Sequence, residues 1–357
     1  MVGIALLGAG IFAREQHLPA IDSVPSLSLK AIYSRSESSA NTLASAASSP
    51  VDVYYDVPTA GSGSGEAANV EKTLDALLAR TDIDAVVIAL PILAQPAVIE
   101  KALKAGKHVL SEKPVAKDVE EAKRLVGFYE ALNLDNNKKK PLWAVAENFR
   151  YTPSLLKAAE KVKEIGGKLT TFRLNMNGWV EEGNKYFKTE WRKVPSYQGG
   201  FLLDGGVHFI AGLRLLLSEL NQEITHVAGF SALLEERLLP VDTVHAVALT
   251  NDGKSGTISI SFGTQFKTGL EVEVVTTQGS VYWNPTQIKT KTKEGEETEE
   301  FEKSTGVKEE MAAFAKAIEK GQTEKEQTPE EALKDLEVVQ RLLESGEGKG
   351  IVKAVEA

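Results

Sequence analysis

The chain has 357 residues, of which 42% are hydrophobic and 25% are charged, as is typical of a globular protein with two domains. It has no cysteine, which excludes disulfides, thiol nucleophiles, cysteine-ligated zinc and iron–sulfur clusters. A net charge of -9 disfavours nucleic acid as a partner, and no apolar run approaches the roughly 20 residues of a membrane span. The apolar N-terminus runs straight into a glycine turn, which predicts a strand and not a signal peptide, and we expect a cytoplasmic protein.

The first part of the chain alternates short apolar runs with helical patterns. These patterns predict strands over 3–7, 27–33, 85–89, 108–110 and 142–145, and helices over 12–20, 73–79, 95–105 and 119–132. Strands that alternate with helices predict a doubly wound parallel sheet of Rossmann type. Two inserts, the Gly- and Ser-rich segment 59–65 and the polar segment 133–140, are predicted to be surface connections.

After about Thr152 the pattern changes to that of an α+β domain with a mostly antiparallel sheet. Strands are predicted over 171–175, 244–249, 256–262 and 270–276, and few helices are predicted before a final one over 329–345. The acidic run 294–302 is predicted to be a solvated loop or sheet edge. We therefore predict an α/β protein with domains over 1–150 and 151–357, whose final helix packs back on the first domain.

A glycine-rich turn stands between the first predicted strand and the first predicted helix. Gly8 and Gly10 open a G-x-G-x-x-A pattern in the context that a dinucleotide-binding turn requires. Gly8 would make the tight turn, and Gly10 would let a pyrophosphate approach the backbone. The amides of Ile11 and Phe12 and the helix dipole would then hold the anion. The alternative is an ordinary glycine-rich connection.

The end of the second predicted strand bears on cofactor choice. An NAD-preferring fold usually has an acidic side chain here for the ribose 2′-hydroxyl, whereas this chain has Ser34 and Arg35. An arginine and hydroxyl groups would bind a 2′-phosphate. The sequence therefore predicts NADP(H) over NAD, unless Arg35 is only a solvated surface residue.

Two further segments carry residue types suited to chemistry. Glu112, Lys113 and Pro114 follow a predicted parallel strand, at the sheet edge where ligands bind. Asp204 and His208 follow a glycine-rich stretch and would share one face of a helix. Near a helix N-terminus the dipole would disfavour the cationic imidazole and keep His208 able to accept a proton. The alternative for His208 is a helix histidine with no role in a reaction.

Together these motifs resemble the Gfo/Idh/MocA oxidoreductases over essentially the whole chain. Segments 10–14, 146–148 and 191–195 are similar to a fungal, cytosolic NADP(H)-dependent branch of that family. The resemblance implies a Rossmann domain, then an α/β domain on an open, predominantly antiparallel sheet, and pairing into a homodimer. Members typically oxidise a sugar or polyol hydroxyl or catalyse the reverse reduction.

The resemblance also implies roles for individual residues. Lys113 would contact the nicotinamide ribose and a substrate oxygen, Asp204 would orient the substrate, and His208 would be the acid/base. The cofactor would also contact Glu112, Leu90, Pro91 and Arg192. One departure is that Ile92 and Gln95 replace the usual Asn and His after the predicted strand 85–89, which makes the cofactor contact there less certain.

Two functions follow from these residues. The first is an NADP(H)-dependent oxidoreductase that transfers a hydride to or from a hydroxyl or carbonyl carbon of a sugar, polyol, diol or small aldehyde. His208 would take the hydroxyl proton, worth about 10²–10⁴-fold, and Lys113 would stabilise the alkoxide. The second is a non-catalytic NADP-sensing regulator on the same fold; the intact set of Lys113, Asp204 and His208 favours the enzyme.

The remaining predictions concern substrate contacts and partners. Tyr186 and Trp191 precede the Asp204 segment, where they would either stack on a sugar ring or simply pack. The other histidines are scattered without metal-ligand spacing, so no metal site is predicted. The expected partner is a small-molecule substrate, with neither nucleic acid nor a membrane.

Overall fold

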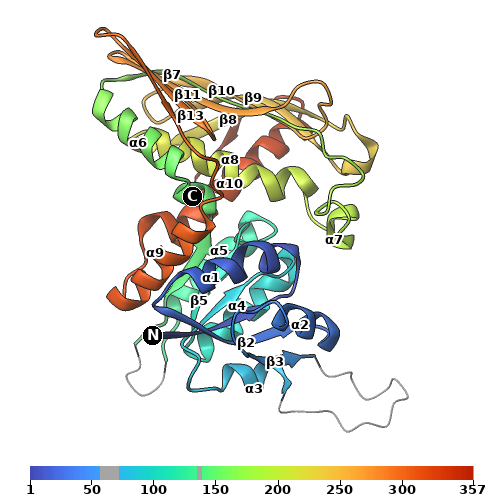
Figure 1. The fold of residues 1–357 in the computed structure, drawn as a ribbon. Coiled ribbons are helices and arrows are strands. Elements are labelled where there is room, and N and C mark those ends of the chain that lie inside the picture. The colour runs from blue at the N-terminus through green and yellow to red at the C-terminus, as the bar shows by residue number, and fades with distance from the viewer. Residues whose placement is uncertain (57–71, 135–138, 357) are drawn as a thin grey trace. The chain divides into compact units, whose positions relative to one another are not determined.

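The computed structural model describes residues 1–56, 72–134 and 139–356, so the predicted loop 59–65 and part of the connection 133–140 lie outside the described residues. The chain forms two compact units (Figure 1). Unit 1 comprises Met1–Ala116, Lys123–Ala146 and Val307–Pro329, and unit 2 comprises Lys117–Ala122, Glu147–Gly306 and Glu330–Ala357.

Unit 1 is built on a six-stranded parallel sheet in the order β3-β2-β1-β4-β5-β6. Its strands are β1 (Val2–Leu7), β2 (Leu27–Ser34), β3 (Asp52–Tyr55), β4 (Ala85–Ile88), β5 (His108–Glu112) and β6 (Trp143–Ala146). The strand order reverses between β1 and β4, and ligands bind at the carboxyl ends of the strands at such a point. The predicted Rossmann sheet is confirmed, although β3 was not predicted.

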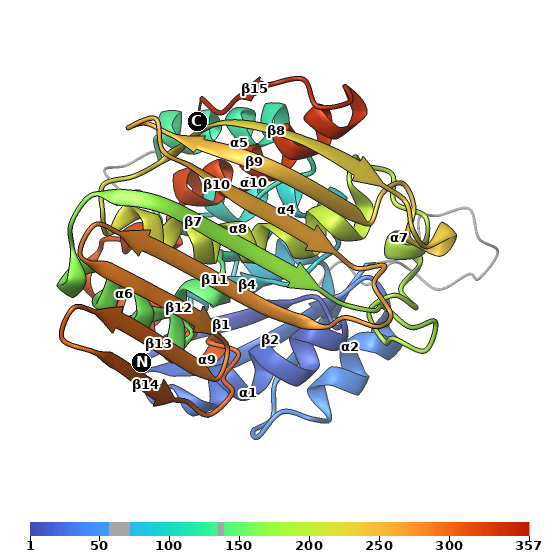
Figure 2. The same ribbon diagram turned by 90° about the horizontal axis from the view of Figure 1, so that it is seen from above.

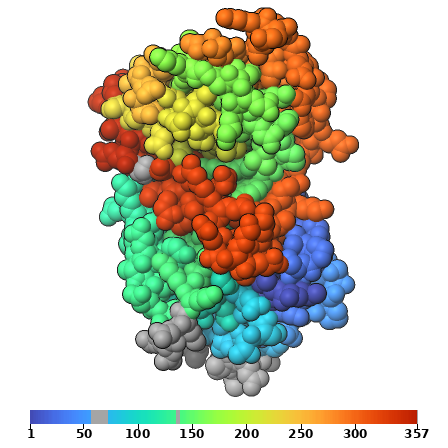
Figure 3. All heavy atoms as spheres, turned by 90° about the vertical axis from the view of Figure 1, so that its left-hand side faces the viewer, coloured from blue at the N-terminus to red at the C-terminus, as the bar shows by residue number. Residues whose placement is uncertain are grey.

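Helices cover this sheet on both faces. They are η1 (Ala13–His17), α1 (Leu18–Ser23), α2 (Glu37–Ala44), α3 (Leu74–Leu78), η3 (Ile92–Ala94), α4 (Gln95–Lys104), α5 (Val119–Ala131), α9 (Val307–Lys320) and η6 (Lys325–Gln327). The late helix α9 shares one hydrophobic core with β1, α1 and α2 through fully buried Met311 and Phe314. Figure 3 shows this red-orange segment beside the dark blue N-terminal residues. The chain thus returns to unit 1 after residue 306, which the predicted division at 150 did not include.

Unit 2 is built on a nine-stranded sheet in the order β14-β13-β12-β11-β7-β10-β9-β8-β15, seen from above in Figure 2. Its strands are β7 (Leu169–Asn177), β8 (Ile224–Ala232), β9 (Thr243–Thr250), β10 (Ser255–Ser261), β11 (Gly269–Thr276), β12 (Gly279–Asn284), β13 (Gln287–Thr292), β14 (Glu296–Glu300) and β15 (Lys353–Ala354). All neighbouring pairs are antiparallel except β7 and β10. The predominantly antiparallel sheet is therefore confirmed, and the acidic run forms its exposed end strand β14.

Helices α6, α8 and α10 pack on one face of this sheet (Figures 1 and 2), and unit 2 has further short helices. The helices of unit 2 are η4 (Asn148–Tyr151), α6 (Pro153–Ile165), α7 (Glu190–Lys193), α8 (Gly200–Ser218), η5 (Glu236–Leu238) and α10 (Pro329–Glu347). From Glu330 onward α10 belongs to unit 2, as does Lys117–Ala122 of the predicted first domain, and the backbone N–H of Val119 donates to Oε1 of Gln340 in α10. That the final helix packs back on the first domain stays a prediction. Within unit 2, Arg214 of α8 forms ion pairs with Glu331 and Asp335 of α10.

Helix α8 is the most apolar helix of this layer. By length and composition it could cross a membrane, and 67% of its most apolar window is buried inside the structure. Core helices of globular proteins have the same character. The buried side of α8 carries Asp204, so the helix that fills the core of unit 2 also presents site residues.

Candidate active site

The glycine turn of unit 1 has the geometry that an anion site requires. Gly8 has a φ of 118°, and a Cβ there would lie 2.2 Å from the Ala89 carbonyl oxygen, so glycine is needed. Gly10 is exposed, and no atom lies within 4 Å of the position that its Cβ would take. The open backbone at Gly10, followed by Ile11 and Phe12 at the start of a helix, fits the phosphates of a dinucleotide.

The end of β2 combines the predicted residues with an acidic group that sequence reasoning missed. Ser34 is the last residue of β2, and Arg35 is exposed. The Tyr33 hydroxyl donates a hydrogen bond to the Asp56 carboxylate, which follows β3. Burial raises the pKa of Tyr33, Asp56 raises it further, and Arg35 opposes the rise. Arg35 and Asp56 thus both act electrostatically on the Tyr33 hydroxyl, and β3 would have to be recognised to find Asp56.

The carboxyl ends of β4 and β5 hold the other predicted residues of unit 1. Leu90 and Pro91 are partly buried after β4, where Ile92 and Gln95 are buried. Glu112 ends β5, and its Oε1 lies 2.7 Å from Nε2 of His17 in η1. Lys113 follows and is partly buried. The fully buried His17 therefore ties Glu112 to the helix that starts at the glycine turn, a link that the sequence analysis missed.

In unit 2, Asp204 and His208 lie on α8 as the spacing predicted, and His208 has a carboxylate partner. Nδ1 of His208 lies 2.6 Å from Oε1 of Glu147, and the two side chains are 17% and 2% exposed. The Phe149 ring stacks on the imidazole, with centroids 4.7 Å apart and planes 16° apart. Because Nδ1 is engaged, Nε2 is the nitrogen available for proton transfer.

One argument made for His208 is wrong. Helix α8 begins at Gly200, so His208 lies more than two turns inside the helix. The effect of the helix dipole falls off within the first turn. The argument from the helix terminus therefore does not apply to His208, whose side-chain partner is Glu147.

Asp204 has a cationic partner on α7. Its Oδ2 accepts a hydrogen bond of 2.8 Å from Nε of Arg192, and Asp204 is 6% exposed. The guanidinium carbon of Arg192 lies 3.9 Å from the ring centroid of Trp191 and 5.5 Å from that of Tyr186. Arg192, predicted to contact the cofactor, thus binds Asp204 in this structure and lies against both aromatic residues predicted to contact the substrate.

Tyr197 is a residue of this group that the sequence analysis left unassigned. Its hydroxyl is buried and has no hydrogen-bond partner among the described residues. Burial raises the pKa of Tyr197, and the charge of Asp204 raises it further. Its ring lies 6.4 Å from that of Trp191. An aromatic residue in the glycine-rich approach to α8 was the available signal.

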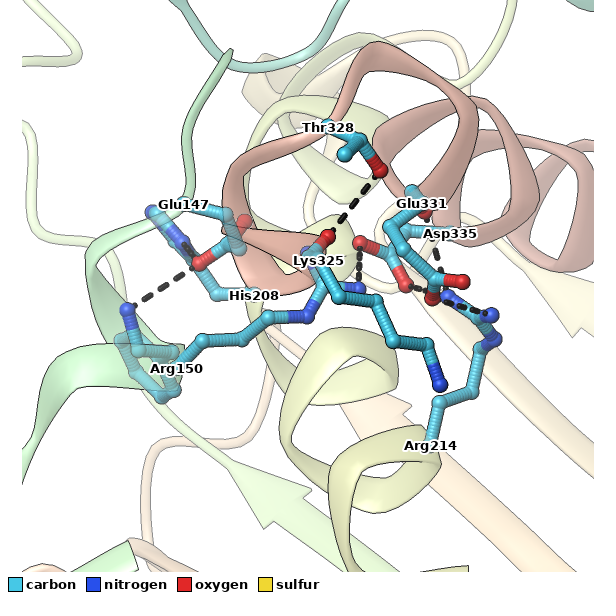
Figure 4. Close-up of polar contacts among 9 residues, drawn as sticks. Glu147, Arg150, His208, Arg214, Lys325, Thr328, Glu331 and Asp335 are labelled. Carbon is cyan, nitrogen blue, oxygen red and sulfur yellow. Dashed lines mark hydrogen bonds and ion pairs between the residues drawn. The ribbon is translucent and has the colours of Figure 1, made fainter. Parts of the chain in front are cut away.

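A buried ion cluster lies beside the pair of His208 and Glu147 (Figure 4). Arg150 of η4 contacts Asp335 of α10 at 2.6 Å. Arg214 of α8 contacts Asp335 at 2.5 Å and Glu331 at 2.8 Å. The cluster connects η4, which follows Glu147, with α8, which carries His208, and with α10. Over residues 1–56, 72–134 and 139–356, no three His, Asp or Glu side chains are grouped to hold a metal ion.

Comparison with known proteins identifies the family. The model of the Gfo/Idh/MocA NAD-binding Rossmann fold matches residues 2–134, and that of the family's C-terminal alpha/beta domain matches residues 162–354. The chain belongs to the Gfo/Idh/MocA oxidoreductase family. The resemblance inferred from the glycine turn, the Glu112 segment and the Asp204 segment is thus confirmed.

Individual members of the Gfo/Idh/MocA family resemble the chain over most of its length. Dehydrogenase FPY6 of Fusarium mangiferae is 51% identical, covering 100% of this chain and 99% of its own. D-xylose 1-dehydrogenase (NADP(+)) 2 of Haloferax volcanii is 26% identical, covering 76% of this chain and 81% of its own. The crystal structure of an oxidoreductase from Thermotoga maritima has a TM-score of 0.84 at 29% identity, covering 99% of this chain and 98% of its own.

Proposed function

We propose that this protein is an NADP(H)-dependent oxidoreductase that transfers a hydride to or from a hydroxyl or carbonyl carbon of a sugar, polyol, diol or small aldehyde. The observation that carries the proposal is His208, held 2.6 Å from Glu147 through Nδ1 while its side chain remains 17% exposed. An imidazole so held can exchange a proton through Nε2. The relative named as an NADP(+)-dependent xylose dehydrogenase supports both the cofactor and the substrate class.

The cofactor would be held by residues of unit 1. The turn from Gly8 to Phe12 would bind the pyrophosphate, Ser34 and Arg35 the 2′-phosphate, and Glu112 and Lys113 the nicotinamide ribose. Leu90 and Pro91 follow β4 at the strand-order reversal and would line the path between the two ends. When bound, the nicotinamide donates or accepts the hydride.

The other residues would handle the substrate. His208 would accept the hydroxyl proton in oxidation and return it in reduction. The Lys113 ammonium would stabilise the negative charge that develops on the substrate oxygen. Asp204, fixed by Arg192, would orient a neighbouring hydroxyl, and Tyr186 and Trp191 would offer ring faces to a sugar. The homodimer and the cytoplasmic location implied by the resemblance remain predictions.

The activity is tested by a fluorescence-monitored screen of aldoses, polyols, aldehydes and diols with NADP⁺ and NADPH. Lys113→Met and His208→Ala serve as controls that remove the proposed cation and base. We expect turnover in the wild type and its loss in both variants. Turnover that survives in both would contradict the assigned roles, and tight NADPH binding without any turnover would favour the sensing regulator.

The cofactor preference is tested separately by measuring Kd for NADPH and NADH. Arg35→Ala should weaken NADPH binding about 10-fold or more, because a hydrogen bond to a charged group contributes about 1.5–3 kcal/mol. NADH binding should change little. Asp56→Asn is the matched control for the neighbouring carboxylate, and a preference unchanged by Arg35→Ala would show that this pocket does not read a 2′-phosphate.

A further inference from the structure

The carboxylate of Glu147 lies behind His208 and has no role in the reaction as described so far. We propose that Glu147 is a positioning residue that fixes the tautomer of His208, keeping the proton on Nδ1 so that Nε2 presents its lone pair to the substrate. This inference rests on the proposed function of His208 as acid/base. It assigns to residue 147 a role that the glycine, Lys113 and Asp204 motifs do not include.

The local contacts favour Glu147 as the acceptor. Its side chain is 2% exposed, so water does not compete for it. The same oxygen, Oε1, that contacts His208 also accepts the backbone N–H of Phe149 at 3.2 Å. An oxygen that already accepts one hydrogen bond has a second lone pair for Nδ1–H. The stacked Phe149 ring then fixes the plane of the imidazole, so the orientation of Nε2 is set from two sides.

Charged side chains also surround the pair. The surrounding elements contribute two guanidiniums, Arg150 and Arg214, and three carboxylates, Glu147, Glu331 and Asp335 (Figure 4). Counting each as ionised, the cluster carries one net negative charge. On α8 itself the nearest acidic residue, Asp204, is already paired with Arg192.

The ion cluster is close enough to sense Glu147. Burial raises the pKa of Asp335, the guanidiniums of Arg150 and Arg214 oppose the rise, and the charge of Glu147 adds to it. Arg150 belongs to η4, directly after Glu147, and Arg214 lies on α8, the helix of His208. Because both guanidiniums bind Asp335, the cluster fixes the segment that carries Glu147 relative to the helix that carries His208.

The first experiment uses the wild type and does not depend on turnover. The side-chain nitrogens of histidine are labelled with ¹⁵N, and the His208 signals are assigned by their loss in His208→Gln. At alkaline pH we expect the Nδ1-protonated tautomer. An Nε2-protonated tautomer would overturn the proposal, whatever reaction the protein catalyses.

The second experiment removes the charge of Glu147 while keeping its shape. Glu147→Gln replaces a carboxylate, which can only accept, by an amide that can also donate to Nδ1, so the Nδ1-protonated tautomer is no longer enforced. We expect kcat to fall about 10²–10⁴-fold, as for other orienting carboxylates, with KM and the NADPH Kd within about 3-fold of wild type. The acid limb of the kcat/KM pH profile should shift, because the imidazole loses its anionic partner.

Glu337→Gln is the matched control, since Glu337 is a fully buried, ion-paired glutamate of unit 2 whose partner is Arg341. It should keep the wild-type kcat and the wild-type His208 tautomer. A Glu147→Gln protein with wild-type kcat and pH profile would overturn the proposal. If Glu147→Gln fails to fold, the wild-type tautomer decides it alone. If no substrate turns over, the proposed function fails while the tautomer still tests the pairing.

Discussion

Each unit contains one histidine paired with one glutamate, and the two pairs are reversed in exposure. In unit 1, His17 is fully buried and its partner Glu112 is 12% exposed, with 2.7 Å between Nε2 and Oε1. In unit 2, Glu147 is 2% exposed and its partner His208 is 17% exposed, with 2.6 Å between Nδ1 and Oε1. The distance between the two groups is nearly the same in both pairs. The more exposed residue, which can meet a ligand, is the glutamate in unit 1 and the histidine in unit 2.

This reversal separates two uses of one interaction. The second ring nitrogen of His17, Nδ1, is buried and has no hydrogen-bond partner in the described part of the chain, so His17 can only orient the carboxylate of Glu112. In the other pair the carboxylate is the buried member and orients the imidazole. The accessible partner is the one suited to chemistry, and the hidden partner is the one that positions it.

The largest expected effect comes from replacing each histidine by glutamine. His208→Gln should lower kcat about 10²–10⁴-fold, because it removes the proposed base. His17→Gln should keep kcat within about 10-fold but lower the free energy of unfolding by about 1–3 kcal/mol, because it disturbs a buried hydrogen-bonded group. Steady-state kinetics and urea unfolding measure the two effects. A larger loss of kcat in His17→Gln would reverse the comparison.

Asp335→Asn tests the ion cluster that lies beside the pair of His208 and Glu147. This change removes a fully buried charge that holds Arg150 and Arg214, and such losses typically cost about 3–5 kcal/mol. Urea unfolding followed by tryptophan fluorescence measures the loss. Glu331→Gln, which affects Arg214 alone and at a more accessible site, should cost less. Equal losses in the two variants would mean that Asp335 is not the centre of the cluster.

Tyr197 offers the contrast of a polar group without a partner. Tyr197→Phe removes a buried hydroxyl that makes no hydrogen bond within the described residues. The free energy of unfolding should therefore stay the same or rise by up to about 1 kcal/mol, because the folded state no longer holds a desolvated, unpaired group. Thermal and urea unfolding beside the wild type measure this change. A loss above about 1 kcal/mol would mean that the hydroxyl is paired in solution.

The smallest effect concerns His108, a third histidine whose Nδ1 accepts the backbone N–H of Leu142 at 2.9 Å. Burial lowers its pKa below the ordinary 6.5, although Asp84 opposes this. Below pH 6.5 the unfolded chain therefore binds the proton first, so this histidine lowers stability as the pH falls. The urea midpoint should decline less between about pH 7 and 5 in His108→Gln than in wild type. An equal decline would exclude His108 as the cause.

Local patterns made most of unit 1 predictable and less of unit 2. Strands β1, β4 and β6 are visible as short apolar runs, because parallel strands are buried on both faces. The final helix α10 is visible because one buried face leaves apolar residues at helical spacing. Helix α9 has that signal too, with Val307, Met311 and Phe314 on one face, but it was not used. No local pattern could tell that α9 completes the core of unit 1, because that depends on residues almost 300 positions earlier.

The candidate site was also predictable only in part. The spacing of Asp204 and His208 predicts that they lie on the same side of a helix, because residues four apart share a helix face. Their partners do not follow from spacing, since Glu147 is 61 residues from His208 and the Tyr33 to Asp56 contact joins the ends of two strands. Motifs therefore pointed to the groups that are proposed to meet ligands, whereas their side-chain partners required a three-dimensional structure.

The return of the chain to unit 1 through Val307–Pro329 has a consequence for dissecting this enzyme family. A recombinant fragment ending near residue 150 would lack Met311 and Phe314 and leave their apolar partners on β1 and α1 facing water. Such a fragment should aggregate. A fragment to which segment 307–329 is joined by a short linker would keep Met311 and Phe314 packed against β1 and α1. Chimaeras that exchange cofactor preference between relatives should therefore be spliced at the five junctions between the segments of the two units, not at one.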